Sequence, residues 1–231
     1  MMKRRSVHFI LITALVLFTV SCGIPNIYVP SSSDVSIVSN SKEDGWFTVN
    51  FSHTVLNELR DGSPTIYFFY TISEESQSSS FSEAIKKFNS TYCSETGGQI
   101  IDSESGKPVA EYSTGSGESQ KTYGLYQLSL ESFDLEQVDS TELTLKKYAD
   151  GTLMLCDENG YVLSSSIKRY NSKAFKRSLM SSDDEIVDYS VSNYYTVRVY
   201  ALVSCQFNNY NNVFNTTLSS SSPILEFSLE E

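Results

Sequence analysis

The chain has 231 residues, an aromatic content of 13% and a formal net charge of −11 at pH 7. This acidity argues against a nucleic-acid-binding protein, because such binding depends on neutralising phosphates with Lys and Arg. It also disfavours adsorption to an anionic membrane surface. The length is sufficient for one domain with a sizeable core, and the many aromatic residues are typical of β-structure.

The first 21 residues have the layout of a secretory signal. Lys3, Arg4 and Arg5 precede an apolar run at 9–20. This run is too short to cross a bilayer, since a spanning helix needs about 20 apolar residues. We therefore expect residues 1–21 to be a signal peptide, the alternative being a short membrane helix that is never cleaved. Cleavage would leave 14 basic and 28 acidic residues, a net charge of −14.

A cysteine follows the apolar run directly. Ser21-Cys22-Gly23 resembles the lipobox of bacterial lipoproteins, and Thr19, where Leu is usual, makes it similar to the relaxed lipoboxes of spirochaete lipoproteins. The resemblance implies that Cys22 is lipidated and anchors the protein to a bacterial membrane, with two or more acyl chains giving stable attachment. It favours the outer membrane, with the protein facing the periplasm or the exterior. Ordinary signal cleavage, with Cys22 as a disulfide partner, is the alternative.

The front of the mature chain predicts strands and one helix. Residues 22–44 are expected to form a lipid-anchored tether and a first strand, and residues 45–231 one β-sandwich domain. Alternation at 46–51 predicts a strand with one buried face. Residues 65–72 are apolar on both faces, which predicts a central strand covered from both sides. A serine N-cap and an apolar stripe predict a short inserted helix near 80–89.

Two turn dipeptides lie in the middle of the chain. Asp150-Gly151 and Asn159-Gly160 separate alternating runs, and such dipeptides supply the positive φ angles of tight turns. They predict two successive hairpins, built from strands at 143–148, 152–156 and 161–165.

The clearest alternation lies near the C-terminus, at 195–205. Its period of two predicts a strand with one face in the core. Arg198 belongs to the other face, where a change of charge is expected to cost little. A long loop at 206–217 and a last strand at 224–229 should follow. The residues expected to face the core are Tyr195, Val197, Val199 and Ala201.

The same region carries a second resemblance. The run 195–201 resembles strand F of fibronectin type III domains, and Ser221-Ser222-Pro223 resembles their F-to-G connection. The resemblance implies an all-β fold, an antiparallel β-sandwich of immunoglobulin or fibronectin type III type, with insertions and one short helix. It implies no activity.

Three cysteines remain in the body of the chain: Cys93, Cys156 and Cys205. An oxidising envelope allows one disulfide among them. Because Cys205 belongs to the inward face of its strand, we expect it to be a buried free thiol. This favours a Cys93–Cys156 disulfide and leaves the other two pairings as alternatives.

Groups suited to catalysis are sparse. His53 is the only histidine after the signal, so a site with a nucleophile and a histidine base would have to use it. The chain has no Gly-x-Ser-x-Gly motif and no phosphate-binding glycine loop. The acidic run 183–185 matches no calcium-loop spacing. We therefore expect a protein that is not an enzyme and uses no metal or cofactor.

Asparagine and tyrosine gather in the predicted loop before the last strand. These residue types give rigid aromatic area and adaptable hydrogen bonds, and loops on a rigid sandwich are common binding sites. We expect a cell-envelope lipoprotein with a non-catalytic binding or structural role, and a protein or glycan as ligand. The alternatives are a loop without a partner, a carboxylate-dependent hydrolase of envelope or host polymers, and a carrier of a hydrophobic ligand. The candidate binding residues are Asn208, Asn209, Tyr210, Asn211 and Asn212.

Overall fold

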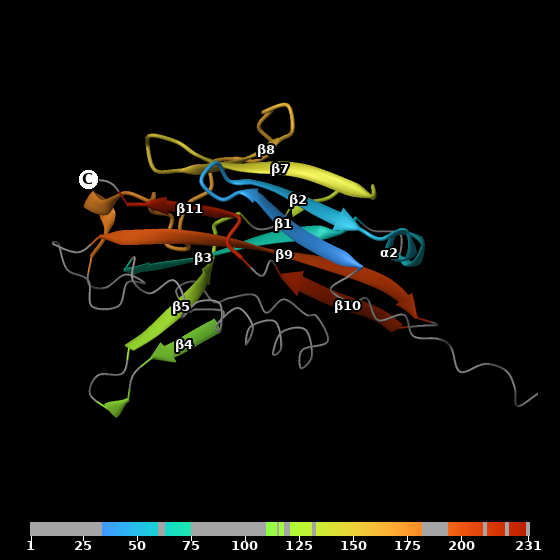
Figure 1. Cartoon of the computed structure of the whole chain (residues 1–231), viewed down its shortest axis with the longest axis horizontal. Coiled ribbons are helices and arrows are strands. Elements are labelled where there is room, and N and C mark those ends of the chain that lie inside the picture. Colours follow the sequence, from blue (N-terminus) through green and yellow to red (C-terminus); the bar gives the residue numbers. More distant parts are fainter. Residues whose placement is uncertain are drawn as a thin grey trace, which may run out of the picture.

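The structure is a computed structural model. Its strands form two antiparallel sheets that pack face to face, so the protein is an all-β sandwich (Figure 1). The residues that the structure describes are 34–59, 63–74, 110–114, 116–117, 121–130, 133–181, 194–209, 212–219 and 222–229.

The smaller sheet, here called sheet A, has the strand order β1-β2-β7-β8. Its strands are β1 (Val35–Ser41), β2 (Trp46–Phe51), β7 (Ser140–Lys147) and β8 (Leu153–Asp157).

The larger sheet, here called sheet B, has the order β10-β9-β3-β5-β4, with β11 also paired to β9 and β6 to β3. Its strands are β3 (Thr65–Glu74), β4 (Ala110–Thr114), β5 (Lys121–Gln127), β6 (Phe133–Asp134), β9 (Tyr195–Asn209), β10 (Asn212–Ser219) and β11 (Leu225–Ser228).

The long strand β9 organises sheet B. One side of β9 pairs with all of β3, from Glu74 opposite Tyr195 to Thr65 opposite Ser204. Its other side pairs first with β11 and then with β10. The predicted inward residues of β9 are confirmed, because all four are at most 1% exposed and belong to the core. They are Tyr195, Val197, Val199 and Ala201.

Arg198 lies on the face of its strand opposite the core, as predicted, but the assumption that this face is open to solvent is wrong. Its side chain is buried, because the second face of sheet B is covered as well as the core face. Other residues of the same second face are buried too: Thr71, Ser73, Tyr200 and Leu202. The prediction that β3 is a central strand covered on both sides is therefore confirmed.

The first predicted hairpin is confirmed and the second only in part. β7 pairs with β8 around Gly151, which has φ 79°, and the Asp150 carboxylate accepts hydrogen bonds from the backbone and hydroxyl of Thr152. The chain turns again at Gly160, with φ 82°. The segment 161–165 then forms no strand, because only an isolated bridge at Val162 joins it to β8.

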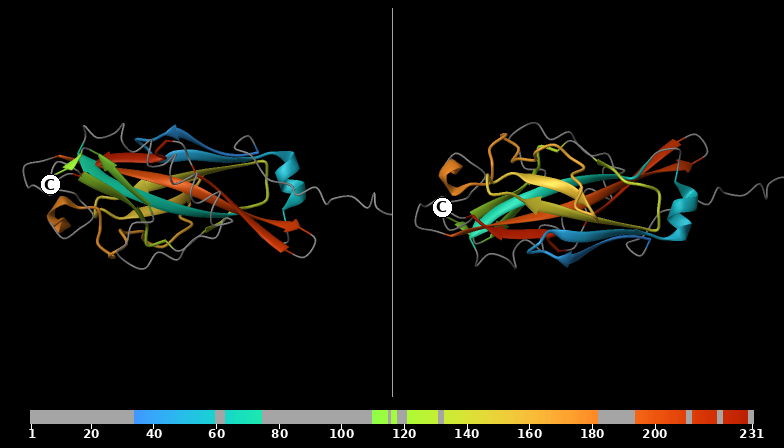
Figure 2. Two further views of the ribbon diagram at one scale, coloured as in Figure 1. Left: turned by 90° about the horizontal axis from the view of Figure 1, so that it is seen from below. Right: turned by 90° about the horizontal axis from the view of Figure 1, so that it is seen from above.

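A short helix that the sequence analysis missed lies at one end of the sandwich (Figure 2). It is α2 (His53–Glu58), and the Ser52 hydroxyl caps it by accepting a hydrogen bond from the Val55 amide. A single 3₁₀ turn, η3, covers Arg177–Leu179. The helix predicted near 80–89 lies outside the described residues, as do the predicted signal peptide, Cys22 and most of the tether.

The cysteines follow the prediction in part. Cys205 is a buried free thiol in the core, as expected, and burial raises its pKa to about 12. Cys156 is also a buried free thiol, so the favoured Cys93–Cys156 disulfide is wrong. Cys156 lies on the edge strand β8 of sheet A, paired with Thr144 on one side and bridged to Val162 on the other. Cys93 itself lies outside the described residues.

The prediction of a long loop at 206–217 is also wrong. β9 continues to Asn209, and β10 begins at Asn212, so most of this segment belongs to a hairpin. The sandwich architecture is as predicted, and the closer resemblance to fibronectin type III domains stays a prediction.

Candidate functional site

Exposed apolar side chains gather on sheet A. Among the described residues, eight large hydrophobic side chains are exposed; five of them lie on the outer face of sheet A or at its β8 edge, and a sixth, Val138, lies in the segment that leads into β7. Contiguous exposed apolar surface is uncommon on soluble proteins and marks interaction sites. The six residues are Val38, Trp46, Val138, Tyr161, Val162 and Leu163.

The strand register aligns part of this surface into one row. Trp46 lies opposite Thr144, Thr144 opposite Cys156, and Cys156 opposite Val162. Directly opposed residues of antiparallel strands share a face. Neighbouring strands are about 4.8 Å apart, so the row spans about 14 Å. We call these four residues the cross-strand row.

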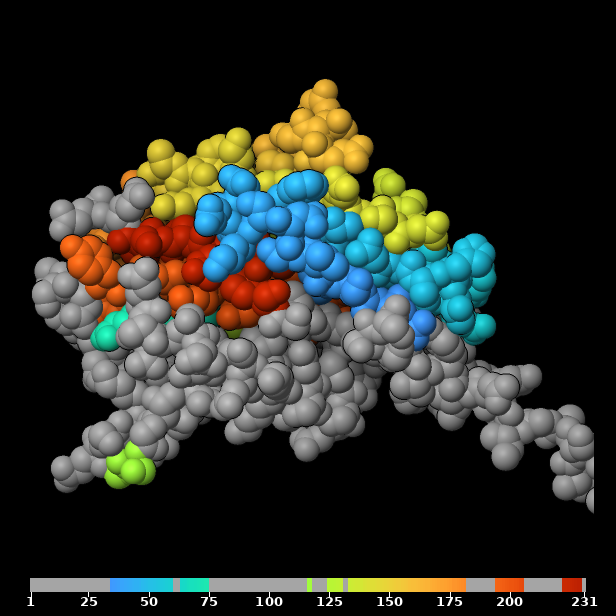
Figure 3. All heavy atoms as spheres, viewed as in Figure 1, coloured from blue at the N-terminus to red at the C-terminus, as the bar shows by residue number. Residues whose placement is uncertain are grey.

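The two ends of the row stand above its middle. Trp46 is 43% and Val162 52% exposed, whereas Cys156 is only 2% exposed. Burial raises the pKa of the Cys156 thiol. Threonine and cysteine are small, so the row is a shallow floor between two large apolar side chains. The amber segment that follows β8 projects from this side of the molecule (Figure 3).

A groove of about 440 Å³ runs over this floor. Thr144 and Cys156 line it, whereas Trp46 and Val162, the two ends of the row, do not; charged residues make up more than half of the lining. The turn between β1 and β2 contributes Glu43 and Asp44, and the turn after β8 contributes further acids. The remaining lining residues are Lys146, Lys147, Asp157, Glu158, Gly160, Leu225 and Phe227.

A second groove, of about 470 Å³, lies on the other side of the β8 turn and shares Asp157 and Glu158 with the first. Its apolar lining includes Val138 and Leu163. Its charged lining is entirely acidic: Asp134, Glu136, Glu142, Asp157 and Glu158.

The charges around the two grooves are unbalanced. They amount to seven carboxylates and two lysines. Among the described residues, none of the seven carboxylates takes part in an ion pair. The lysines lie against aromatic rings, with Lys147 Nζ 4.7 Å from the Phe227 ring centroid and Lys146 Nζ 5.9 Å from that of Tyr148. The acidic rim is therefore open to a cationic partner.

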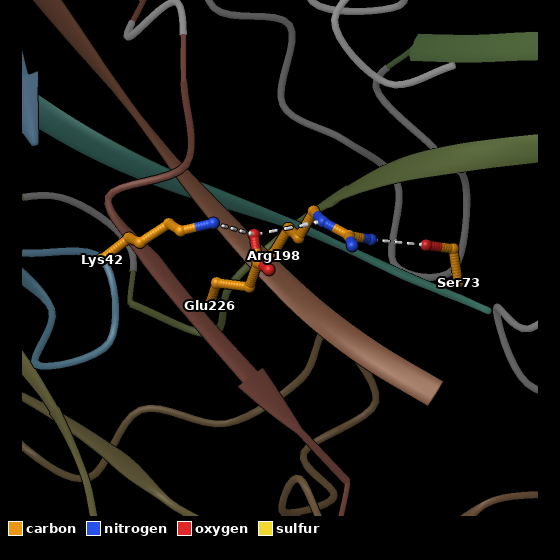
Figure 4. Close-up of polar contacts among 4 residues, drawn as sticks. All are labelled: Lys42, Ser73, Arg198 and Glu226. Carbon is orange, nitrogen blue, oxygen red and sulfur yellow. Dashed lines mark hydrogen bonds and ion pairs between the residues drawn. The ribbon is translucent and has the colours of Figure 1, made fainter. Parts of the chain in front are cut away.

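A polar network fixes the turn that carries Glu43 and Asp44 (Figure 4). The Glu226 carboxylate on β11 lies 3.3 Å from Lys42 Nζ and 3.3 Å from Arg198 Nε. Arg198 also donates a 2.8 Å hydrogen bond to the Ser73 hydroxyl on β3. The backbone amide of Glu226 donates to the Lys42 carbonyl. The network thus joins the β1–β2 turn to three strands of sheet B.

Gly45 ends this turn with φ +70°, where a side chain is strained. Its carbonyl accepts a hydrogen bond from the Leu145 amide on β7. A Cβ at this position would collide with the Leu145 carbonyl oxygen. The glycine therefore lets the turn pack directly against β7, beside the groove.

The predicted site residues lie elsewhere. Asn208 and Asn209 end β9 and Asn212 begins β10, with Asn209 opposite Asn212 in the hairpin of sheet B. Tyr210 and Asn211 lie outside the described residues, so binding at this hairpin stays a prediction. His53 is exposed at the start of α2.

The alternation at 46–51 places Trp46 on the face of its strand opposite the core, but it indicates no role for this residue. The consecutive apolar residues 161–163 after a turn were the other available signal. Neither shows that positions 46, 144, 156 and 162 form one row, because that depends on strand register.

Comparison of the chain with protein-family models, curated proteins and solved structures finds no match. Within the described ranges, no group of three or more His, Cys, Asp and Glu side chains is arranged to hold a metal ion. Also within these ranges, no helix is both long and apolar enough to cross a membrane.

Proposed function

We propose that the protein is a cell-envelope lipoprotein whose β-sandwich is a non-catalytic binding module. The outer face of sheet A is its binding surface. The observation that carries the proposal is the cross-strand row, in which exposed Trp46 and Val162 flank the small residues Thr144 and Cys156.

This surface has the composition of a binding interface. Interfaces combine an apolar centre with a polar rim, and Trp and Tyr are over-represented among the residues that carry binding energy. Here Trp46, Tyr161 and Val162 supply exposed apolar area, and the carboxylates of the two grooves supply the rim. Because the face is built on paired strands, its residues are held in fixed relative positions.

The envelope location rests on the N-terminal sequence. The basic start, the short apolar run and Cys22 support export and lipidation. Lipidation at Cys22 would keep the sandwich at the membrane and raise the local concentration of envelope partners.

Oxidative footprinting tests the binding surface. Hydroxyl radicals are generated on the purified protein and on intact cells that make it, and side-chain oxidation is measured by mass spectrometry. We expect Trp46 and Tyr161 to be protected in cells. Leu179 and Tyr194 are matched controls, since they are 42% and 80% exposed away from sheet A, and should be oxidised equally in both samples. Equal oxidation of Trp46 in both samples would contradict the proposal.

A further inference from the structure

The cross-strand row provides a binding position, here called the seat, for one apolar side chain of a partner. Trp46 and Val162 are exposed at its ends, and the floor between them is made by Thr144 and Cys156. The row spans about 14 Å at the usual strand spacing. An aliphatic side chain placed over the floor would cover Thr144 and Cys156 and lie between the exposed apolar side chains at the two ends.

Four carboxylates and two lysines, Lys146 and Lys147, line the groove over this seat, so its net charge is negative. Glu43 and Asp44 approach from the β1–β2 turn, and Asp157 and Glu158 from the turn after β8. None of these four carboxylates has an ion-pair partner among the described residues. Basic groups flanking an apolar side chain would match this arrangement, and electrostatic complementarity of this kind sets partner choice and association rate.

The same charges disfavour other occupants. A second copy of the chain carries a net charge of −11 before any processing. A surface of anionic lipid would be repelled by the rim in the same way.

The edge of β8 is closed to an added strand. The Asp157 amide donates to the Tyr161 carbonyl, and the Leu163 amide to the Leu155 carbonyl. Leu153 and Ile167 exchange both backbone hydrogen bonds. The following segment thus occupies the β8 edge, so a partner that binds beside β8 contacts side chains and does not pair with β8 as an added strand.

We infer that the outer face of sheet A binds a segment of another protein that is rich in Lys and Arg and carries an aliphatic side chain between its basic residues. The aliphatic side chain lies between Trp46 and Val162, and the basic side chains pair with the acids of the groove. This inference rests on the proposed function and names its partner class.

The test uses the full mature chain and short fluorescent peptides. One peptide alternates lysine and leucine, a second alternates glutamate and leucine, and a third alternates lysine and serine. We expect saturable binding of the lysine–leucine peptide alone. The substitutions Trp46→Ala and Glu158→Lys should each weaken it about tenfold, as for central interface residues. The matched controls Leu179→Ala and Glu58→Lys, both at exposed positions away from the groove, should leave it unchanged.

Several results overturn the inference. These are no saturable binding, equal binding of the glutamate–leucine peptide, and binding that Glu58→Lys weakens as much as Glu158→Lys. Self-association that Trp46→Ala abolishes would assign the face to a second copy. If the peptide fails while Trp46 stays protected from oxidation in cells, the partner class is wrong and the binding surface stands. If both fail, the proposed function fails with it.

Discussion

Arg198 and Glu226 form an ion pair across strands β9 and β11, with Nε 3.3 Å from Oε2. The same carboxylate oxygen lies 3.3 Å from Lys42 Nζ. The two cations differ in environment, since the Arg198 side chain is 4% exposed and that of Lys42 is 52% exposed. The Glu226 carboxylate therefore takes part in one buried and one exposed ion pair, and the two pairs can be compared within the same network.

This difference predicts unequal stability effects. Arg198→Ala should lower the free energy of unfolding by about 3 kcal/mol, because it removes a buried charge partner of Glu226 and the donor to the Ser73 hydroxyl. Lys42→Ala should lower it by less than about 1 kcal/mol, as for exposed ion pairs. Urea denaturation of both variants measures the two values. Equal losses would show that the Arg198 pair contributes no more than a surface pair.

A second prediction compares adjacent residues of β2. Phe47 is fully buried and makes an edge-to-face contact with Phe68, at 6.1 Å between ring centroids. Phe47→Ala should cost about 3–5 kcal/mol of stability. Trp46→Ala, on the outer face, should cost about 1 kcal/mol or less. Thermal denaturation followed by circular dichroism checks both. A large loss for Trp46→Ala would mean that Trp46 supports the fold, and the binding tests would then require Trp46→Phe instead.

The core thiol predicts a pH dependence. Burial raises the pKa of Cys205 from 9.0 to about 12. In the unfolded chain the thiol ionises near its ordinary pKa, so above pH 9 the unfolded state binds fewer protons than the folded state. The contribution of the protonated Cys205 thiol to the free energy of unfolding is therefore complete below pH 9 and is lost as the pH rises toward 12. Urea titrations at pH 8 and pH 10.5 should show lower stability at the higher pH.

The variant Cys205→Ala should reduce this slope without removing it. Burial also raises the pKa of Tyr200 from 10.0 to about 12. The Tyr200 phenol therefore adds a further loss of stability as the pH rises from 10 to 12. An identical slope in Cys205→Ala and the parent chain would contradict the assignment of Cys205 to the core.

Lipidation is testable apart from the fold. Cells fed a radioactive fatty acid should label the parent protein and leave Cys22→Ala unlabelled, because only Cys22 lies directly behind the apolar run. Cys93→Ala is the matched control and should stay labelled. Labelling of Cys22→Ala equal to that of the parent would exclude the proposed anchor.

Much of the strand content was predictable from local patterns. The span of β2 was predicted to the residue, and the β7–β8 hairpin followed from Asp150-Gly151. Both features depend on residues close together in the chain. The alternation of β9 also located its core face correctly.

Features that depend on contacts between segments far apart in the chain were not predicted from the sequence. The burial of Arg198 arises because both faces of sheet B are covered, whereas alternation alone suggests one solvated face. The asparagine-rich ends of β9 and β10 have low strand propensity, and their mutual pairing outweighs it. Helix α2 has six residues, too few for a helical period to stand out.

The candidate site was the least predictable part. Its row joins position 46 to positions 144, 156 and 162 through three separate strand pairings. A shift of one residue in any pairing would turn part of the row toward the core. The sequence shows the apolar residues, and only the register shows that they share a surface.

The most direct test of the central claim, that the outer face of sheet A is a binding surface, is photo-crosslinking in cells. A photoreactive phenylalanine analogue is placed at position 46 or at position 179, two sites of nearly equal exposure in the parent chain. Irradiation should convert the protein with the analogue at position 46 into a discrete larger species on a denaturing gel and leave the protein with the analogue at position 179 unchanged. Absence of the larger species at position 46, or the same species from both positions, would contradict the account.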